Sequence, residues 1–395
     1  MRTLRAATTA ILLGTAALGA GAALQPAAAA VSAAVGKPLQ EAQSLANAGK
    51  YREAMDRVNA AAAAAKTAEE RKVTDQMKQF VAIKSGDPSI GGALGAKAKF
   101  AKDVSAGRWK DVIADGDMLR KNNALDGQSQ LVIAQAHYQL HDPKGCIAYI
   151  KRAGLGGETA LTLLQRCAYD ANDDDTQRQA LEQLVATTGK PEHWKNLLRL
   201  SERARGMKDH NTLDIYRLKA MTGNLATSDD VMTYAQIALQ LKMSAEAKAV
   251  IEKSIADKTL PATDRTNRLL KLATDRVNAD NANAAKALAA AQKAPKGDDL
   301  VEIGEAQIGE GKAKDAIATI KAGLDKGCAD AANCQLRLGT AYLAAGQKAD
   351  AIKAFNAVKG DDKVVMVAHL YALAARSGIS AAAPADGPPA KGRRR

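Results

Sequence analysis

The sequence predicts an all-α protein built as a solenoid of short helix pairs, and three observations support this. Alanine occurs in long tracts and Gln, Lys and Leu are common, all of which favour helices. Alternation of apolar and polar residues, the pattern typical of strands, is scarce. One arrangement of small and large apolar residues recurs along most of the 395 residues, as it does in repeat proteins.

The clearest copy of this pattern lies near the C-terminus, in the stretch LRLGTAYLAAGQKADAIKAFNAVKG. Gly339 stands inside an apolar helical run, where Gly costs about 1 kcal/mol relative to Ala. We expect the helix that carries Ala351 to need this space, with Tyr342 and Phe355 filling the layer beside it. Gly346 then ends the first helix and permits the turn into the second.

The same spacing recurs earlier in the chain. Residues 300–326 repeat the pattern of 335–359 with a shift of 35 residues. Weaker copies lie at 41–58, 131–153 and 234–253. Further helix pairs fit the register without the motif, at 93–122, 159–187, 192–222 and 263–294.

The recurring unit resembles the tetratricopeptide repeat, a helix–turn–helix of about 34 residues. The resemblance covers most of residues 36–376, within an expected solenoid of residues 31–378. It implies a right-handed superhelix in which the first helix of each pair lines a concave, partner-binding face. Another αα-solenoid or a two-lobed helical protein remains the alternative, with a break at the Gly- and Pro-containing stretch 86–95.

Residues 1–30 have the pattern of a secretory signal peptide. Arg2 and Arg5 provide the basic start, residues 6–24 are apolar, and small residues precede a cleavage site at Ala30-Val31. A transmembrane anchor is the alternative, but the apolar run is rich in Ala and Gly and is broken early. We therefore expect an exported protein that does not span the membrane and is periplasmic or secreted.

The formal net charge is +13, and part of it lies at the two ends of the chain. Residues 379–395 are rich in Pro and Gly and end in three arginines, so we expect a disordered basic tail. Elsewhere basic and acidic residues alternate along the predicted helices, which is typical of a solvated surface. Aromatic residues make up only 3% of the chain, so specific nucleic-acid binding is not indicated.

Four cysteines in an exported chain permit two disulfides. Cys146 and Cys167 lie at equal distances from the turn between two antiparallel helices, and Cys328 and Cys334 flank a short loop. The repeat register therefore favours the pairs Cys146–Cys167 and Cys328–Cys334, while four reduced cysteines in packed positions remain the alternative. Neither spacing matches a redox motif or a zinc site.

No residue pattern indicates an enzyme, a cofactor or a metal. His137 and His141 are four residues apart on a predicted helix, but no third ligand accompanies them. Residues 170–182 alternate acidic and amide side chains like a calcium loop, yet they lack the central Gly and place Glu182 one residue late. We expect a packed histidine in the first case and a polar turn that caps a helix in the second.

The expected concave face carries a series of amide side chains. Helical register places an amide at both groove-facing positions of three repeats, where it can donate and accept hydrogen bonds to the backbone of an extended peptide. Exposed Gln is also simply a good helix former, and this remains the alternative. The predicted partner-binding residues are Gln43, Asn47, Gln135, Tyr138, Gln139, Gln236, Leu239, Gln240 and Arg337.

These observations predict a non-enzymatic scaffold that binds a protein or peptide through its concave face. Envelope assembly, secretion or passive chaperoning are the contexts that fit an exported protein of this kind. The alternative is an electrostatic binder of anionic cell-envelope polymer, acting through the basic tail and surface.

Overall fold

The computed structural model describes residues 31–379 and consists there of nineteen α-helices without a β-strand. The all-α prediction is confirmed for this part of the chain. Residues 1–30 and 380–395 lie outside it, and with them the predicted signal peptide, the residue before the Ala30-Val31 cleavage site and almost all of the basic tail. Within each of two compact units, consecutive helices pack against one another, as they do in α-solenoids.

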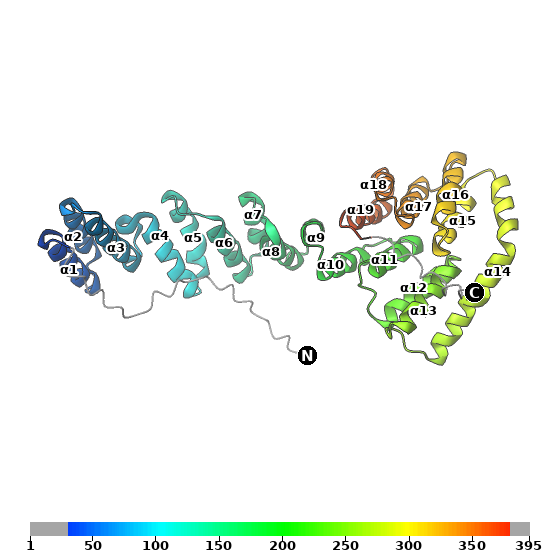
Figure 1. Ribbon diagram of the computed structural model, residues 1–395, viewed down its shortest axis with the longest axis horizontal. Helices are drawn as coiled ribbons and strands as arrows, with labels where there is room; N and C mark the ends of the chain where they lie inside the picture. The colour runs from blue at the N-terminus through cyan, green and yellow to red at the C-terminus, as the bar shows by residue number, and fades with distance from the viewer. Residues whose placement is uncertain (1–30, 380–395) are drawn as a thin grey trace, which may run out of the picture. The chain divides into compact units, whose positions relative to one another are not determined.

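The chain divides after His141 into two compact units. In the described part of the first unit, six helices follow one another (Figure 1): α1 (Ala33–Asn47), α2 (Tyr51–Ala64), α3 (Ala68–Ser85), α4 (Pro88–Ser105), α5 (Trp109–Lys121) and α6 (Gly127–Gln139). The stretch 86–95 lies within this unit, where α3 passes into α4. The backbone of α4 is kinked at Gly92, whose φ of 52° favours glycine.

The second unit holds the other thirteen helices of the described chain: α7 (Pro143–Ala153), α8 (Gly157–Asp170), α9 (Asp174–Thr188), α10 (Pro191–Glu202), α11 (Asp209–Met221), α12 (Ser228–Gln240), α13 (Ser244–Ala256), α14 (Asp264–Lys293), α15 (Asp298–Gly309), α16 (Ala313–Lys326), α17 (Ala331–Ala344), α18 (Lys348–Asn356) and α19 (Asp362–Arg376). The last helix packs on α9, α11, α17 and α18. The C-terminal end of this unit therefore returns to its earlier helices.

The local sequence explains where many helices begin and end. Thr67 and Glu70 form a capping box at the start of α3, and Thr263 accepts a hydrogen bond from the third residue of α14. Gly86 and Gly154 end α3 and α7 in the left-handed conformation that suits glycine.

One expectation from the register is wrong: residues 263–294 do not form a helix pair. They form the single helix α14, which is 30 residues long. No Gly or Pro occurs between Asp264 and Lys293, so nothing in the backbone favours a turn. The alanine-rich second half has a high helix propensity and continues the helix instead.

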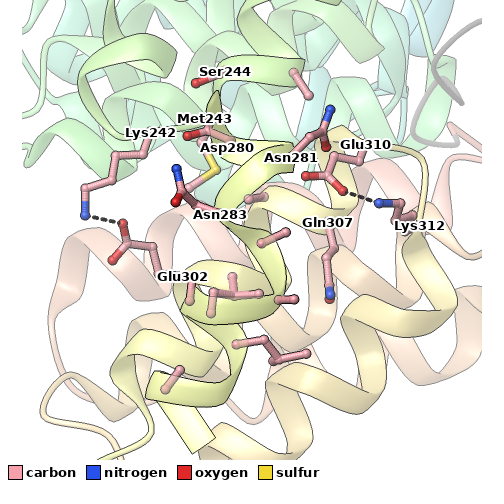
Figure 2. A pocket seen from close by; sticks show the side chains of 18 of the residues that line it. Lys242, Met243, Ser244, Asp280, Asn281, Asn283, Glu302, Gln307, Glu310 and Lys312 are labelled. Atoms are coloured by element: carbon pink, nitrogen blue, oxygen red, sulfur yellow. Dashed lines mark hydrogen bonds and ion pairs between the residues drawn. The ribbon is translucent and has the colours of Figure 1, made fainter. Parts of the chain in front are cut away.

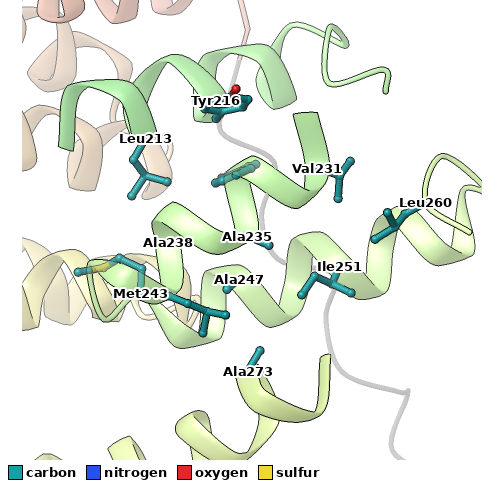
Figure 3. Packing of buried hydrophobic residues seen from close by; sticks show 12 residues of the cluster. Leu213, Tyr216, Val231, Ala235, Ala238, Met243, Ala247, Ile251, Leu260 and Ala273 are labelled. Carbon is teal, nitrogen blue, oxygen red and sulfur yellow. The ribbon is translucent and has the colours of Figure 1, made fainter. Parts of the chain in front are cut away.

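Small residues lie where helices touch in the second unit, as the repeat pattern predicts. Ala235 and Ala238 of α12 and Ala247 of α13 are fully buried in a cluster formed by α11 to α14 (Figure 3). Ile251 and Leu260 extend the same cluster, and Ala273 of α14 closes it. The first half of α14 is thereby attached to the core.

Gly339 has the role that its position predicts. A Cβ atom added there would lie 2.4 Å from the ring of Phe355, so only glycine lets α17 and α18 approach this closely. Gly304 stands in the same way against Ile320. The Phe355 ring in turn stacks on Tyr371 of α19, with centroids 5.3 Å apart.

None of the helices in residues 31–379 is both long enough and apolar enough to cross a lipid bilayer. The predicted signal peptide lies outside this range.

Candidate functional site

A groove lies between α13, α14 and α15 in the second unit. It has a volume of about 490 Å³, which is in the range of ligand-binding clefts. Figure 2 shows side chains from all three helices around it. We refer to this hollow as the α14 groove.

The α14 groove exists because α14 is packed only near its two ends. Of its 30 residues, Thr266, Ala273 and Ala291 are buried. Residues 278–290 between them are largely exposed on every side of the helix. The alanine content keeps this segment helical without packing partners, and one of its faces becomes a wall of the groove.

That wall is a continuous helix face. The lining residues of α14 include Val277, Asn281, Ala284, Leu288 and Ala291, at helical spacings of three, four and seven residues along one side. With a rise of 1.5 Å per residue, the face is about 21 Å long. An elongated occupant therefore matches the groove better than a compact small molecule.

The opposite wall and the floor include apolar side chains. Met243 and Ala245 contribute from the start of α13, and Ile303 and Ala306 from α15. Gln307 also lines the groove, and its Oε1 is buried without a hydrogen-bond partner among the described residues. Such orphaned buried acceptors are uncommon in folded proteins.

The rim of the α14 groove carries more acidic than basic side chains. Lys242 Nζ lies 2.8 Å from Glu302 Oε1, and Lys312 Nζ lies 2.8 Å from Glu310 Oε2 (Figure 2). Asp280 and Asp299 lie on the same rim and are exposed, and no salt bridge joins either of them to a basic side chain of the described chain. After the two pairs are matched, two carboxylates remain.

The charge of the rim also shows in the pKa of Lys242. The hydrogen bond and charge of Glu302 raise this pKa above its ordinary value, and the more distant carboxylates of Asp299 and Asp280 act in the same direction. A cation at this rim is thus stabilised by three carboxylates.

A second unusual feature of this unit is a buried network of charged side chains. Arg337 of α17 and Asp214 of α11 form a two-pronged pair, with Nη1–Oδ1 at 2.7 Å and Nη2–Oδ2 at 2.5 Å. Asp214 is 0% and Arg337 2% exposed. Arg337 Nη1 also lies 2.9 Å from Glu305 Oε1 on α15. This ion pair is therefore buried from solvent, and with Glu305 it links three helices.

Arg217 and two tyrosines extend this network. Arg217 donates to both oxygens of Glu246 on α13, at 2.7 and 2.6 Å, and to Glu305 at 2.7 Å. The hydroxyl groups of Tyr234 and Tyr371 donate to Glu246 and Asp214. We refer to these seven side chains as the buried ion network.

The pKa values of the network follow from the balance between burial and pairing. Burial raises the pKa of Asp214, but Arg337 and Arg217 outweigh it and hold that pKa below its ordinary value. The pKa of Glu305 is lowered by the same two guanidinium groups, also against the effect of burial. Asp214 and Glu305 are thus ionised at neutral pH, and the network ties α11, α13, α15 and α17 together.

Two of the predicted partner-binding residues lie in the interior. Arg337 belongs to the buried ion network, and Leu239 is 4% exposed in the core cluster around Ala238. Neither side chain presents a surface to a partner. The repeat register placed them on an accessible helix face, but Arg337 pairs with Asp214 of α11, and Leu239 packs in the cluster formed by α11 to α14.

The other predicted residues are at least partly accessible, and the two units divide them. Gln43 and Asn47 lie on α1 and Gln135, Tyr138 and Gln139 on α6, in the first unit, whereas Gln236 and Gln240 lie on α12 in the second. Two of the amides are engaged within the chain. Lys84 donates to Asn47, and Gln240 donates to Asp209 at 2.8 Å.

The structure pairs the cysteines as Cys146–Cys167 and Cys328–Cys334. Asp298 lies beside the second pair and forms with it the one group of three metal-ligand side chains found close together within residues 31–379. Metal binding requires free thiolates, and the disulfide engages both sulfur atoms.

The other two sequence patterns lie in turns. His141 follows the end of α6 with a φ of 56°, so it is not on the helix of His137 as expected. In the segment that resembles a calcium loop, Asp173 accepts a hydrogen bond from the backbone N–H of Thr176 at 3.0 Å and caps α9. This is the helix-capping turn that we expect from the sequence.

No protein-family model matches the chain, and no curated protein matches it with significance.

Proposed function

We propose that this chain is a non-enzymatic scaffold that binds segments of other proteins, with the α14 groove as a binding site. One observation carries the proposal: the face of α14 that lines the groove is about 21 Å long at 1.5 Å per residue, carries Ala284, Ala287 and Leu288, and is largely exposed between residues 278 and 290. Helix faces of this kind are commonly covered by another helix or peptide.

The proposal keeps the resemblance to tetratricopeptide repeats and to exported proteins. Consecutive helix pairs with small residues at their contacts support a repeat scaffold, and the predicted signal peptide supports action outside the cytoplasm. The accessible amides of α1, α6 and α12 remain a second proposed surface, for extended peptides.

Site-specific photocrosslinking in cells that export the protein tests this function. A benzophenone amino acid at position 287 lies in the groove lining, whereas the same residue at 289 lies on the same helix outside the lining. We expect protein adducts from position 287 and few from 289. Equal adducts from both positions, or none from 287, contradict the proposal.

A further inference from the structure

We propose that the occupant of the α14 groove is a basic amphipathic helix of a partner protein, with large apolar side chains on its inner face and Lys or Arg on its flanks. This inference rests on the proposed function and adds the chemistry of the partner. It follows from the length of the groove, the size of its side chains and the charge of its rim.

Length and shape favour a helix. The lining face of α14 extends from Val277 to Ala291, which corresponds to about four turns. Alanine at positions 284, 287 and 290 lets a second helix approach closely, because the distance between packed helices depends on the side chains at the contact. An α-helix of similar length laid along α14 would face α15 with its other side.

Side-chain size indicates that the occupant brings the large residues. The α14 wall offers mainly Ala, with Leu288 as its largest apolar side chain, and Ile303 and Met243 stand opposite. A partner helix with Leu, Ile or Met at every third and fourth position would fill the remaining space. A partner with only small residues would leave it open.

The rim determines the charge of the occupant. No salt bridge joins Asp280 or Asp299 to a basic side chain of the described residues, while Lys242 and Lys312 are each matched by a glutamate. Lys or Arg on the flanks of a partner helix would neutralise these two carboxylates. An acidic helix would instead add to the repulsion.

The test uses two 18-residue helical peptides that differ only in charge. Both carry Leu at every third and fourth position, and the flanks carry Lys in one and Glu in the other. Fluorescence anisotropy with the full exported chain is expected to show binding of the Lys peptide at least tenfold tighter than that of the Glu peptide. Equal binding of the two peptides overturns the inference.

Variants within α14 locate the binding. Ala284→Trp fills the groove and is expected to lower the affinity for the Lys peptide at least tenfold. Ala282→Trp lies on the same helix outside the lining and is expected to change binding less than twofold. Both positions are exposed, so both variants fold. Equal effects of the two substitutions place the peptide elsewhere and overturn the inference.

Neutralising the rim tests the role of charge. The double variant Asp280→Asn/Asp299→Asn is expected to lower the affinity for the Lys peptide about three- to tenfold. Each exposed ion pair between a peptide Lys and a rim aspartate contributes only modestly. The matched control, Asp56→Asn with Asp75→Asn, changes the net charge equally in the first unit and is expected to have no effect. At 1 M salt the rim variant and the wild type are expected to bind the Lys peptide with equal affinity, because salt screens the rim charges. An equal loss from both double variants shows nonspecific attraction and overturns the inference.

Two outcomes distinguish the proposed function from the proposed chemistry of the partner and from an occupant within the same chain. If photocrosslinks from position 287 persist but the Lys and Glu peptides bind alike, the proposed function stands and the partner chemistry falls. If removal of residues 380–395 increases the affinity for the Lys peptide tenfold, the chain's own basic end is the occupant and the partner helix is overturned.

Discussion

Replacing Arg337 with Met is the sharpest test of the buried ion network. The substitution keeps most of the apolar stem but removes a guanidinium that contacts Asp214 twice and Glu305 once. The network changes from three carboxylates and two guanidinium groups to three carboxylates and one. Breaking a buried pair in this way typically costs about 3–5 kcal/mol, because the remaining charge has lost both water and its partner.

Urea unfolding measures this loss separately in the second unit. The chain's two tryptophans are Trp109 in the first unit and Trp194 in the second, and Trp194 is almost fully buried. With Trp109 replaced by Phe, fluorescence reports on the second unit alone. We expect Arg337→Met to lower its free energy of unfolding by about 3–5 kcal/mol.

Two further variants show whether the cause is the uncompensated charge. Lys271→Met removes an exposed pair with Asp275 and is expected to cost about 0.5 kcal/mol at most. Adding Asp214→Leu to Arg337→Met removes the unpaired carboxylate and should restore about 1 kcal/mol or more of the free energy of unfolding. A loss for Arg337→Met as small as that for Lys271→Met would refute this account of the network.

Three other predictions concern pH and packing. Folding lowers the pKa of Asp214, so the ionised carboxylate stabilises the folded state fully above about pH 4, and this stabilisation is lost as the pH falls through the folded pKa. The urea midpoint of Asp214→Asn should therefore change less with pH in acid than that of the wild type. The hydrogen bond and charge of Glu182 raise the pKa of His369, so this contact between α9 and α19 stabilises the fold below about pH 6.5. The stabilisation is lost as the pH rises through the folded pKa. His369→Gln should remove this pH dependence of the unfolding free energy, which is under about 1 kcal/mol because the imidazole is half exposed. Gly339→Ala pushes a methyl group into Phe355 and should cost about 1–3 kcal/mol in thermal or urea unfolding, whereas Gly156→Ala, which meets open space, should cost little.

The local pattern of the sequence predicts much of the fold, because helix pairs are local structures. Gly339 and Phe355 are only sixteen positions apart, and their contact follows from the repeat spacing. The sequence register predicts a turn within α14, but a tight turn between two helices usually contains Gly or Pro. The signal to look for was the absence of both residues from 264–293.

The sites depend on contacts between distant parts of the sequence, which spacing does not specify. Asp214 and Arg337 are 123 residues apart, and their pairing depends on α19 and α17 returning to α11. This return buries Arg337, whereas Leu239 is buried by the packing of α12 against α11 and α13. The α14 groove was missed for the same reason, because it appears only when α13, α14 and α15 are placed in space.

Hydrogen–deuterium exchange of the protein tests directly whether the α14 groove binds a partner. In the free chain, amides of residues 278–290 should exchange quickly, because this part of α14 has almost no buried contacts. With a saturating partner captured at position 287, or with the Lys peptide, these amides should become protected while those of α1, α6 and α12 remain unchanged. Protection of α1, α6 and α12 with continued fast exchange in α14 would contradict the account and favour the amide surface instead.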